Sequence, residues 1–405
     1  MRSHEFPIPK LAAVLLLSVT ALFFGTSRYF LIVSSLTAFP WIALLGCTLI
    51  LLRFRFQWID FLCALAFVLL CLAFRWRILY LPHLQKILCA LLGVGSLLVL
   101  AARAIWSENK DRTAYLSAFI PAFMLVGSEW LTPPLLHWGE ANHPRTLDLF
   151  LLIFDSTLGF QPSFWMGRLF EGIPLLRSIS LVFYFGLPLL IALVFVEHLR
   201  GNRTRALVAF LIFFFAAILG AASYSLYPAC GPISLLGVNF PHTDLPFSKA
   251  SHLPLEPVPI PGPRNAMPSM HMAWAILAWW LSRDLRRWVN LVCIAFLVFT
   301  VSATLGTGEH YFIDLIVAFP FSLCMYGLFS LDVAFRERTR VRALVGGALG
   351  LFLWLALLRY EIPVFVRFRG LSWGLIVLTV VLVAHAQCAL RHARKLAPAQ
   401  GRPDL

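Results

Sequence analysis

Two histidines and one aspartate in the last third of the chain have the types and spacing needed for nucleophilic and acid–base chemistry. His310 and Asp314 lie four positions apart, which places a carboxylate one helical turn from an imidazole. Such an acid can hold one ring nitrogen protonated and leave the other with a free lone pair. His271 follows Pro268 and Ser269, residue types that begin helices. A second histidine can protonate a leaving group and later activate an acceptor.

Both histidines are predicted at the amino-terminal ends of membrane helices that enter from the same side. A helix amino terminus carries the positive end of the helix dipole and N–H groups without intrahelical partners. Two such ends, beginning near residues 268 and 310, would face one pocket. The sequence therefore predicts a pocket suited to a phosphate group.

Four segments resemble elements of a known family. The run PSMH at 268–271 resembles the PSxH element of the type 2 phosphatidic acid phosphatase superfamily, and His310 with Asp314 resembles the HxxxD end of its last motif. The segment 308–314 is closer to the inositol phosphorylceramide synthase (inositolphosphotransferase) branch, and so are 227–232 and 155–159. The resemblance covers residues 145–335 at most.

The resemblance implies a six-helix phosphatase-type core and a mechanism that needs no metal and no other cofactor. His310 would attack phosphorus and form a phosphohistidine, and Asp314 would orient its ring. His271 would protonate the departing oxygen and then activate water or an alcohol. The substrate would be an amphiphilic phospholipid or a polyprenyl phosphate.

The chain departs from the family pattern where phosphate-binding cations are expected. The first motif, a Lys followed seven residues later by Arg-Pro, has no match, and Ala303-Thr304 replaces the Ser-Arg pair of the last motif. We expect other residues to bind the substrate: Arg264, seven residues before His271, with Lys249 behind it, the hydroxyls of Ser269 and Thr307, and Tyr227.

Composition predicts the elements that hold these residues. The 405-residue chain is 60% hydrophobic and 13% charged, whereas soluble domains carry roughly 25% charged residues. Apolar runs long enough for a bilayer core of about 30 Å recur along the chain. They lie at about 11–26, 30–51, 60–74, 87–102, 113–131, 178–198, 206–226, 268–282, 288–306, 310–334, 343–358 and 371–390. The sequence therefore predicts an all-α, polytopic membrane protein with about 12 transmembrane helices.

The net charge of +14 comes from basic residues in short loops, which favours membrane topology and contact with anionic membrane lipids over nucleic acid binding. One set of alternate loops in the second half holds Arg200, Arg203, Arg205, Arg283, Arg286, Arg287, Arg336, Arg338, Arg340, Arg342, Arg391, Arg394 and Lys395. The other set holds only Lys249, Arg264, Arg359, Arg367 and Arg369. The positive-inside rule predicts that the first set is cytoplasmic, and a count of twelve spans then puts both termini there. The compact loops favour a multi-pass plasma (inner) membrane protein. The 227–267 loop and the 307–310 turn, and with them the active site, would be extracytoplasmic.

Three regions are predicted: an N-terminal four-helix membrane region at 1–112, a catalytic core at 113–335, and a two-helix extension with a cytoplasmic tail at 336–405. The first apolar run is interpreted as a retained span rather than a cleaved signal. Residues 132–177 are predicted to form a loop with an interfacial or re-entrant helix. Four of its polar residues are expected on a solvated face: His137, His143, Asp148 and Asp155. The eight cysteines show no CxxC spacing, so no disulfide framework or metal site is predicted.

Two other functions compete with the lipid phosphatase or phosphotransferase. A lipid or polyprenyl-phosphate transporter suits the many helices, but no repeat relates the two halves of the chain. A catalytically dead scaffold would explain the missing cations, but it would have no reason to keep His271, His310 and Asp314. The sequence leaves open the lipid, the acceptor (water or an alcohol) and the oligomeric state.

Overall fold

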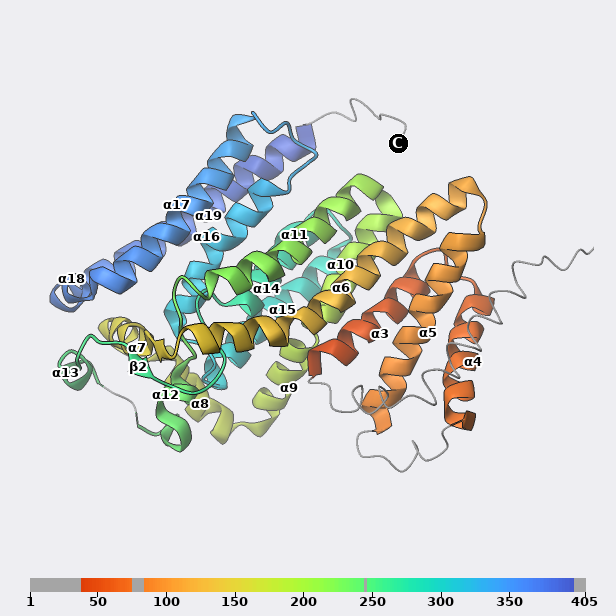
Figure 1. The fold of residues 1–405 in the computed structure, drawn as a ribbon. Helices are drawn as coiled ribbons and strands as arrows, with labels where there is room; N and C mark the ends of the chain where they lie inside the picture. Colours follow the sequence, from red (N-terminus) through yellow and green to blue (C-terminus); the bar gives the residue numbers. More distant parts are fainter. Residues whose placement is uncertain (1–37, 75–83, 244–245, 397–405) are drawn as a thin grey trace, which may run out of the picture. The chain divides into compact units, whose positions relative to one another are not determined.

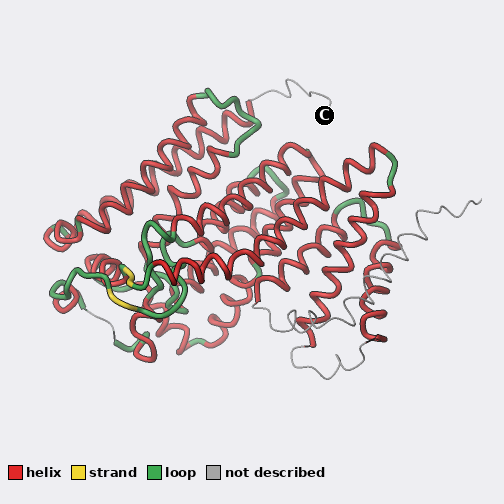
Figure 2. Tube along the Cα trace, viewed as in Figure 1, coloured by secondary structure: helices red, strands yellow, loops and turns green. Residues whose placement is uncertain are grey.

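A computed structural model describes residues 38–74, 84–243 and 246–396 of the chain. Helices make up most of this structure, and the only strands among the described residues form one two-stranded sheet (Figure 2). The predicted all-α class is therefore confirmed for the described part of the chain. The predicted span at 11–26 lies outside it.

The chain divides into two compact units, and residues 1–130 and 188–210 make up the first. Its helices are α3 (Ala38–Arg53), α4 (Trp58–Phe74), α5 (Leu84–Trp106), most of α6 (Asn109–Asn142) and α10 (Leu187–Gly201). Helix α5 packs against both α3 and α4 (Figure 1). Gly93 of α5 allows this approach, because a Cβ there would lie 2.2 Å from the carbonyl oxygen of Leu44.

The second unit, residues 131–187 and 211–405, contains the predicted chemistry. Its helices up to the long loop are α7 (Asp148–Thr157), α8 (Pro162–Gly172), α9 (Pro174–Phe185) and the second half of α11 (Arg203–Ser223). The loop contains α12 (Pro232–Leu236), η2 (Gly237–Asn239) and α13 (Phe247–Ala250). After it come α14 (Met270–Ser282), α15 (Arg287–Gly306), α16 (Phe312–Leu328), α17 (Arg338–Tyr360), α18 (Ile362–Arg367) and α19 (Arg369–Leu396). Strands β1 (Arg145–Thr146) and β2 (Val258–Pro259) pair antiparallel, with Arg145 opposite Pro259.

Helix α16 is at the centre of this unit. Helix α14 packs against α15 and α16, α8 and α9 pack against α15, and α17 and α19 lie alongside α16 (Figure 1). Two glycines bring α16 and α17 close together. A Cβ at Gly327 would lie 2.6 Å from the backbone nitrogen of Leu344, and one at Gly347 would lie 2.4 Å from that of Cys324. The packing fixes the helix that begins next to His310.

The predicted count of about 12 spans is not confirmed. Among the described residues, six helices are long and apolar enough to cross a membrane, and up to seven if the bent pair α9 and α10 counts as one span. The six are Leu84–Trp106, Asp111–Asn142, Arg203–Ser223, Arg287–Gly306, Arg338–Tyr360 and Arg369–Leu396. Helices α3, α4 and α16 are apolar but shorter. Apolar composition located the helices, but it does not fix where each helix breaks.

The region 132–177 contains more helix than predicted. Helix α6 continues through Pro133 and Pro134 to Asn142, and α7, α8 and the start of α9 follow it. Short helices rather than an open loop therefore lie beside the candidate site.

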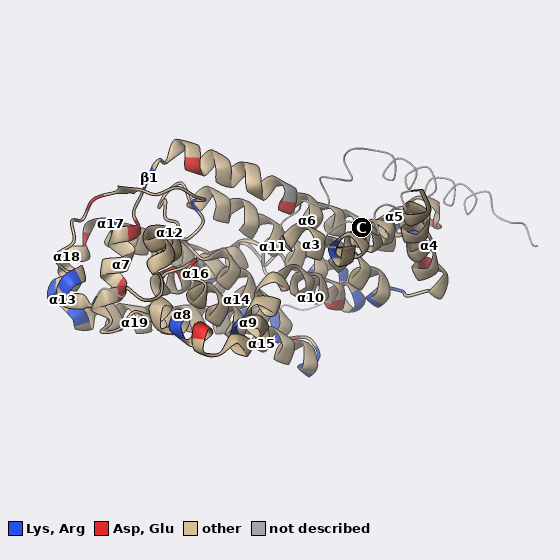
Figure 3. Ribbon diagram, turned by 90° about the horizontal axis from the view of Figure 1, so that it is seen from below, with Lys and Arg blue, Asp and Glu red and all other residues tan. Residues whose placement is uncertain are grey.

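Basic residues of the predicted outer loops lie close together in the second unit. Figure 3 shows Lys and Arg at α18 and α13. The guanidinium of Arg369, at the start of α19, lies 4.4 Å from the ring centroid of Phe247 in α13. The structure thus places the turn before α19 and part of the 227–267 loop on the same side of this unit.

Candidate active site

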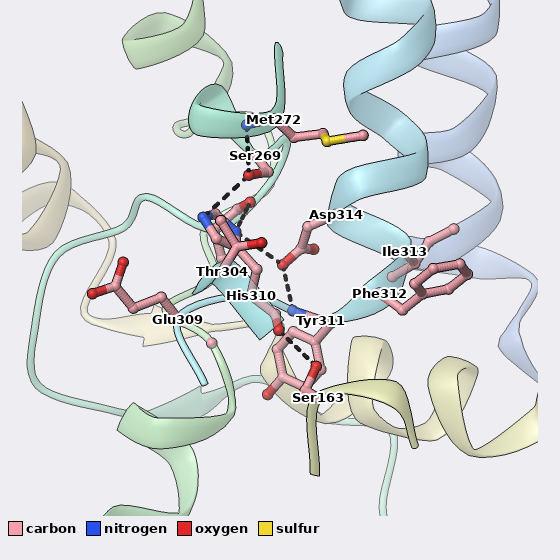
Figure 4. Close-up of polar contacts among 12 residues, drawn as sticks. Ser163, Ser269, Met272, Thr304, Glu309, His310, Tyr311, Phe312, Ile313 and Asp314 are labelled. Carbon is pink, nitrogen blue, oxygen red and sulfur yellow. Dashed lines mark hydrogen bonds and ion pairs between the residues drawn. The ribbon is translucent and has the colours of Figure 1, made fainter. Parts of the chain in front are cut away.

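His310 lies in the turn between α15 and α16, and its side chain is buried. Ring atom Nδ1 is 3.0 Å from the carbonyl oxygen of Ala266 and 3.4 Å from Oδ2 of Asp314 (Figure 4). The backbone of His310 is held as well, because its N–H donates to the carbonyl of Thr304 and its carbonyl accepts from the hydroxyl of Ser163 at 2.8 Å. The ring and backbone are therefore both fixed in position.

These contacts determine which nitrogen of His310 can act as a nucleophile. A carbonyl oxygen can only accept, so Nδ1 carries the proton that it donates to Ala266. Atom Nε2 then has the lone pair of the ring, and it accepts from the hydroxyl of Ser269 at 3.2 Å. Burial lowers the pKa of His310 to about 4, against the opposing effects of Glu309 and the Ala266 carbonyl. The ring is thus neutral near pH 7.

Asp314 links the histidine to the start of α16. Its Oδ2 accepts from the backbone N–H of Tyr311 at 2.8 Å, as part of a capping box, and the same oxygen faces His310. Its Oδ1 is buried and has no hydrogen-bond partner among the described residues. The predicted pairing of Asp314 with His310 is present, and the Ala266 carbonyl adds a second acceptor that sequence reasoning missed.

His271 lies in the first turn of α14, with its ring centroid 6.1 Å from that of His310. Ser269 caps this helix by accepting from the backbone N–H of Met272. The structure therefore brings together the two histidines that the motifs predicted, although 39 positions separate them in the sequence.

Two residues that sequence reasoning did not select complete the surroundings of His271. The hydroxyl of Tyr184, from α9, lies 3.2 Å from Nδ1 of His271 and donates to Oε2 of Glu309 at 2.5 Å. The Tyr184 ring stacks on His271 with centroids 4.2 Å apart. Glu309 had one available signal, its position next to His310. Tyr184 lies in an apolar run far from both motifs and had none.

The expectation of free N–H groups at the start of α16 is wrong. The backbone N–H groups of Phe312 and Ile313 donate to the carboxylate of Asp155, at 2.7 and 3.2 Å. That carboxylate already satisfies the helix end where a phosphate was predicted to bind.

Asp155 and Asp148 are buried, not solvated as predicted. Asp148 accepts from the backbone N–H groups of Cys230 and Gly231 and from the hydroxyl of Tyr311. The two carboxylates of α7 therefore tie the long loop and α16 together. They are buried because they have backbone donors far away in the sequence, which composition does not reveal.

Arg264, predicted to bind phosphate, is buried and donates mainly to backbone carbonyls. Its partners are the carbonyl oxygens of His143, Pro144 and Gly262, and the sulfur of Cys230. These contacts join the long loop to the segment before β1. A role in substrate binding stays a prediction.

The other predicted binding residues differ in position. The hydroxyl of Tyr227, a buried residue, donates to the carbonyl of Leu358 at 3.3 Å. Thr307, in the turn before His310, donates to the carbonyl of Ala303. Lys249 is exposed on α13. The substrate-binding roles of these residues stay predictions.

The long loop packs directly on the histidine turn, as expected for two segments on one side of the membrane. The backbone N–H of Ile233 donates to the carbonyl of Gly308 at 2.9 Å. Gly231 has φ +100°, and a Cβ there would lie 2.2 Å from the carbonyl oxygen of Glu309. Only a glycine fits this position without displacing the turn.

Among the residues that the structure describes, no group of three or more His, Cys, Asp or Glu side chains is arranged to hold a metal ion. The groups that converge on the site are two imidazoles, two carboxylates, a phenol and a hydroxyl. This arrangement can supply a nucleophile and a separate proton donor.

Comparison with protein families gives one match. Residues 149–328 match the model of the PAP2 superfamily, whose members are phosphatases or phosphotransferases. The match runs from the second residue of α7 to the end of α16 and contains both histidines, Asp314, Tyr184 and Glu309. Neither curated proteins nor solved structures gave a match. The comparison supports a phosphatase-type function but does not support the inositol phosphorylceramide synthase branch over any other.

Proposed function

We propose that this chain is a membrane lipid-phosphate phosphatase or phosphotransferase that works through a phosphohistidine on His310. The observation that carries the proposal is the hydrogen bond from Nδ1 of His310 to the Ala266 carbonyl, which leaves the lone pair of the ring on Nε2, the atom that would attack phosphorus. The second histidine, His271, lies at a distance that leaves room for a phosphoryl group between the rings. The match to the PAP2 superfamily supports the same chemistry.

The reaction has two steps. In the first, Nε2 of His310 forms a bond to phosphorus while the bond from phosphorus to the ester oxygen breaks, and His271 gives a proton to that oxygen. In the second, His271 takes a proton from water or an alcohol, whose oxygen attacks phosphorus as the P–N bond breaks. The hydroxyl of Ser269 donates to Nε2 before the reaction, at 3.2 Å, and would donate to a phosphoryl oxygen once Nε2 bonds to phosphorus.

The substrate is an amphiphilic phosphate, a phospholipid or a polyprenyl phosphate, that enters sideways from the outer leaflet. Apolar helices around the site support lateral entry of a lipid chain. The extracytoplasmic orientation is supported by α11, which begins at the basic residue Arg203 and ends just before the 227–267 loop. If Arg203 is cytoplasmic and α11 crosses the membrane, the loop and the site beside it lie on the outer side. In the first unit, Arg55, Arg200 and Arg203 line one cavity of about 400 Å³. The segment that follows α3 therefore lies beside the basic residues where α10 ends and α11 begins, which the proposal puts in the cytoplasm.

The finer assignment, an inositolphosphotransferase-like enzyme, rests on the sequences of three segments, 155–159, 227–232 and 308–314. It predicts that an alcohol competes with water for the phosphohistidine. A phosphatase would release inorganic phosphate at the same rate with or without added lipid or polyol acceptors.

The test is phosphate release and headgroup exchange by the purified protein in detergent with EDTA, over a panel of lipid phosphates. We expect turnover that His310→Ala abolishes and that His137→Ala leaves unchanged, because the side chain of His137 is 89% exposed and does not contact the site. Equal turnover in His310→Ala and the parent would exclude the histidine mechanism. Absence of turnover on every substrate would favour the transporter or the inactive scaffold.

A further inference from the structure

Two side chains beside His271 have no role in the reaction proposed above. Tyr184 comes from α9 and is buried, and Glu309 comes from the turn before α16. The Tyr184 hydroxyl contacts both the imidazole Nδ1, at 3.2 Å, and the Glu309 carboxylate, at 2.5 Å. The three groups thus form a chain from a carboxylate through a phenol to an imidazole.

The positions of the protons follow from the chemistry of the phenol. A tyrosine hydroxyl has one proton, and that of Tyr184 is donated to Glu309. Its oxygen can therefore only accept from His271, so Nδ1 of His271 carries a proton. Atom Nε2 is then the position at which His271 gives and takes the catalytic proton.

We propose that Glu309, acting through Tyr184, is the positioning group that fixes the tautomer of His271 and balances the charge of its imidazolium. This inference rests on the proposed function. Asp314 cannot do the same for His271, because its carboxylate faces Nδ1 of the other histidine and the Tyr311 N–H. A half-buried imidazolium needs a nearby negative charge, since loss of solvent disfavours the charged form.

The proton balance is simple. His271 enters the first step as the imidazolium, with a proton on each ring nitrogen. When the P–O bond breaks, its Nε2 proton moves to the leaving oxygen and the neutral Nδ1–H tautomer remains. In the second step Nε2 takes a proton from water or the alcohol as that oxygen attacks phosphorus and the P–N bond breaks. The Tyr184 proton and the Glu309 charge stay where they are. The other titratable groups near this chain are His310, 6.1 Å from His271 between ring centroids, and Tyr224, which interacts with Tyr184.

The test compares Tyr184→Phe and Glu309→Gln by the pH dependence of turnover. The alkaline limb, where His271 loses its proton, should move to lower pH by about one unit in both variants. The acid limb reports the protonation of His310. Tyr184→Phe keeps the Glu309 charge beside His310, so the acid limb of this variant should not move. Glu171→Gln is the matched control: this exposed α8 carboxylate pairs with His242 at 3.3 Å, outside the site, and the variant should keep the parent profile.

The leaving group separates a proton-transfer role from a structural one. An aryl phosphate, whose phenolate leaves without protonation, should be turned over by both variants at close to the parental rate. A lipid phosphate needs that proton, because an alkoxide is a poor leaving group, so both variants should lose about tenfold or more in turnover on it. Equal losses of turnover on the two substrates, or an unmoved alkaline limb in both variants, would overturn the positioning role of Glu309 and Tyr184.

A spectroscopic measurement does not depend on turnover. Above the alkaline limb, where His271 is neutral, the ¹⁵N shifts of labelled histidine should report the Nδ1–H tautomer in the parent and a mixture of tautomers in Tyr184→Phe. The Nε2–H tautomer in the parent would contradict the inference. His310→Ala separates the proposed function from the positioning role of Glu309 and Tyr184. If His310→Ala keeps activity, the proposed function fails. If His310→Ala loses activity but Tyr184→Phe behaves like the parent, only the positioning role is disproved.

Discussion

At the residue scale, the pKa of His310 makes the pH dependence of the reaction predictable. Burial lowers this pKa from 6.5 to about 4, so Nε2 keeps its lone pair in mildly acidic solution. Activity should therefore be lost only as pH falls through about 4, where the ring gains a proton and can no longer attack. The check is the acid limb of kcat/KM in detergent. A limb near 6.5 would mean that His310 is solvated or is not the nucleophile.

The residues of the site were predictable to different degrees. His271, His310 and Asp314 lie in short motifs whose spacing has a direct chemical meaning, and the structure brings them together. Tyr184 and the carbonyl of Ala266 could not be found this way, because a phenol in an apolar run and a backbone oxygen carry no local signal. They are recognised only once the helices are packed.

At the element scale, Asp155 is predicted to hold the start of α16. Asp155→Ala would leave the N–H groups of Phe312 and Ile313 buried without their acceptor. We expect a loss of about 2 kcal/mol in the free energy of unfolding, and a lower Tm in detergent. Asp111→Ala is the control, because that exposed carboxylate pairs with Arg55 at the surface and should cost less than about 1 kcal/mol. Equal shifts in Tm would contradict the capping role.

The contact between the long loop and the histidine turn gives a second prediction at this scale. Gly231→Ala places a Cβ 2.2 Å from the carbonyl oxygen of Glu309, at a backbone φ of +100°. The turn has to shift, and a displacement of about 1 Å at a catalytic group can lower turnover by roughly 10²-fold. Gly172→Ala, whose Cβ would meet no atom within 4 Å, should keep parental turnover. A fully active Gly231→Ala would show that the turn tolerates displacement.

Helices were easier to predict from the sequence than their ends. The apolar runs at 60–74 and 288–306 correspond to α4 and α15 within a few residues. The run at 178–198 is instead two helices, α9 and α10, bent by 50°. Hydropathy measures transfer to lipid and is unaffected by such a bend, so the span count could not be fixed.

At the scale of the whole molecule, the orientation in the membrane is testable by labelling. Glu256 is exposed in the long loop, and Arg203 is exposed at the start of α11. In intact cells, a membrane-impermeant maleimide should label Glu256→Cys above the background of the parent's native cysteines. Arg203→Cys should be labelled only after permeabilisation. The reverse pattern would place the histidines on the cytoplasmic side.

The central claim is a covalent bond between phosphorus and His310, and trapping that bond tests it most directly. The purified protein would be mixed with a ³²P-labelled lipid phosphate, quenched in alkaline detergent within one turnover, and digested for mass spectrometry. The account predicts an acid-labile, alkali-stable label on the peptide that contains His310, and no label in His310→Ala. Turnover without any protein-bound label, or label on another residue that persists in His310→Ala, would contradict it.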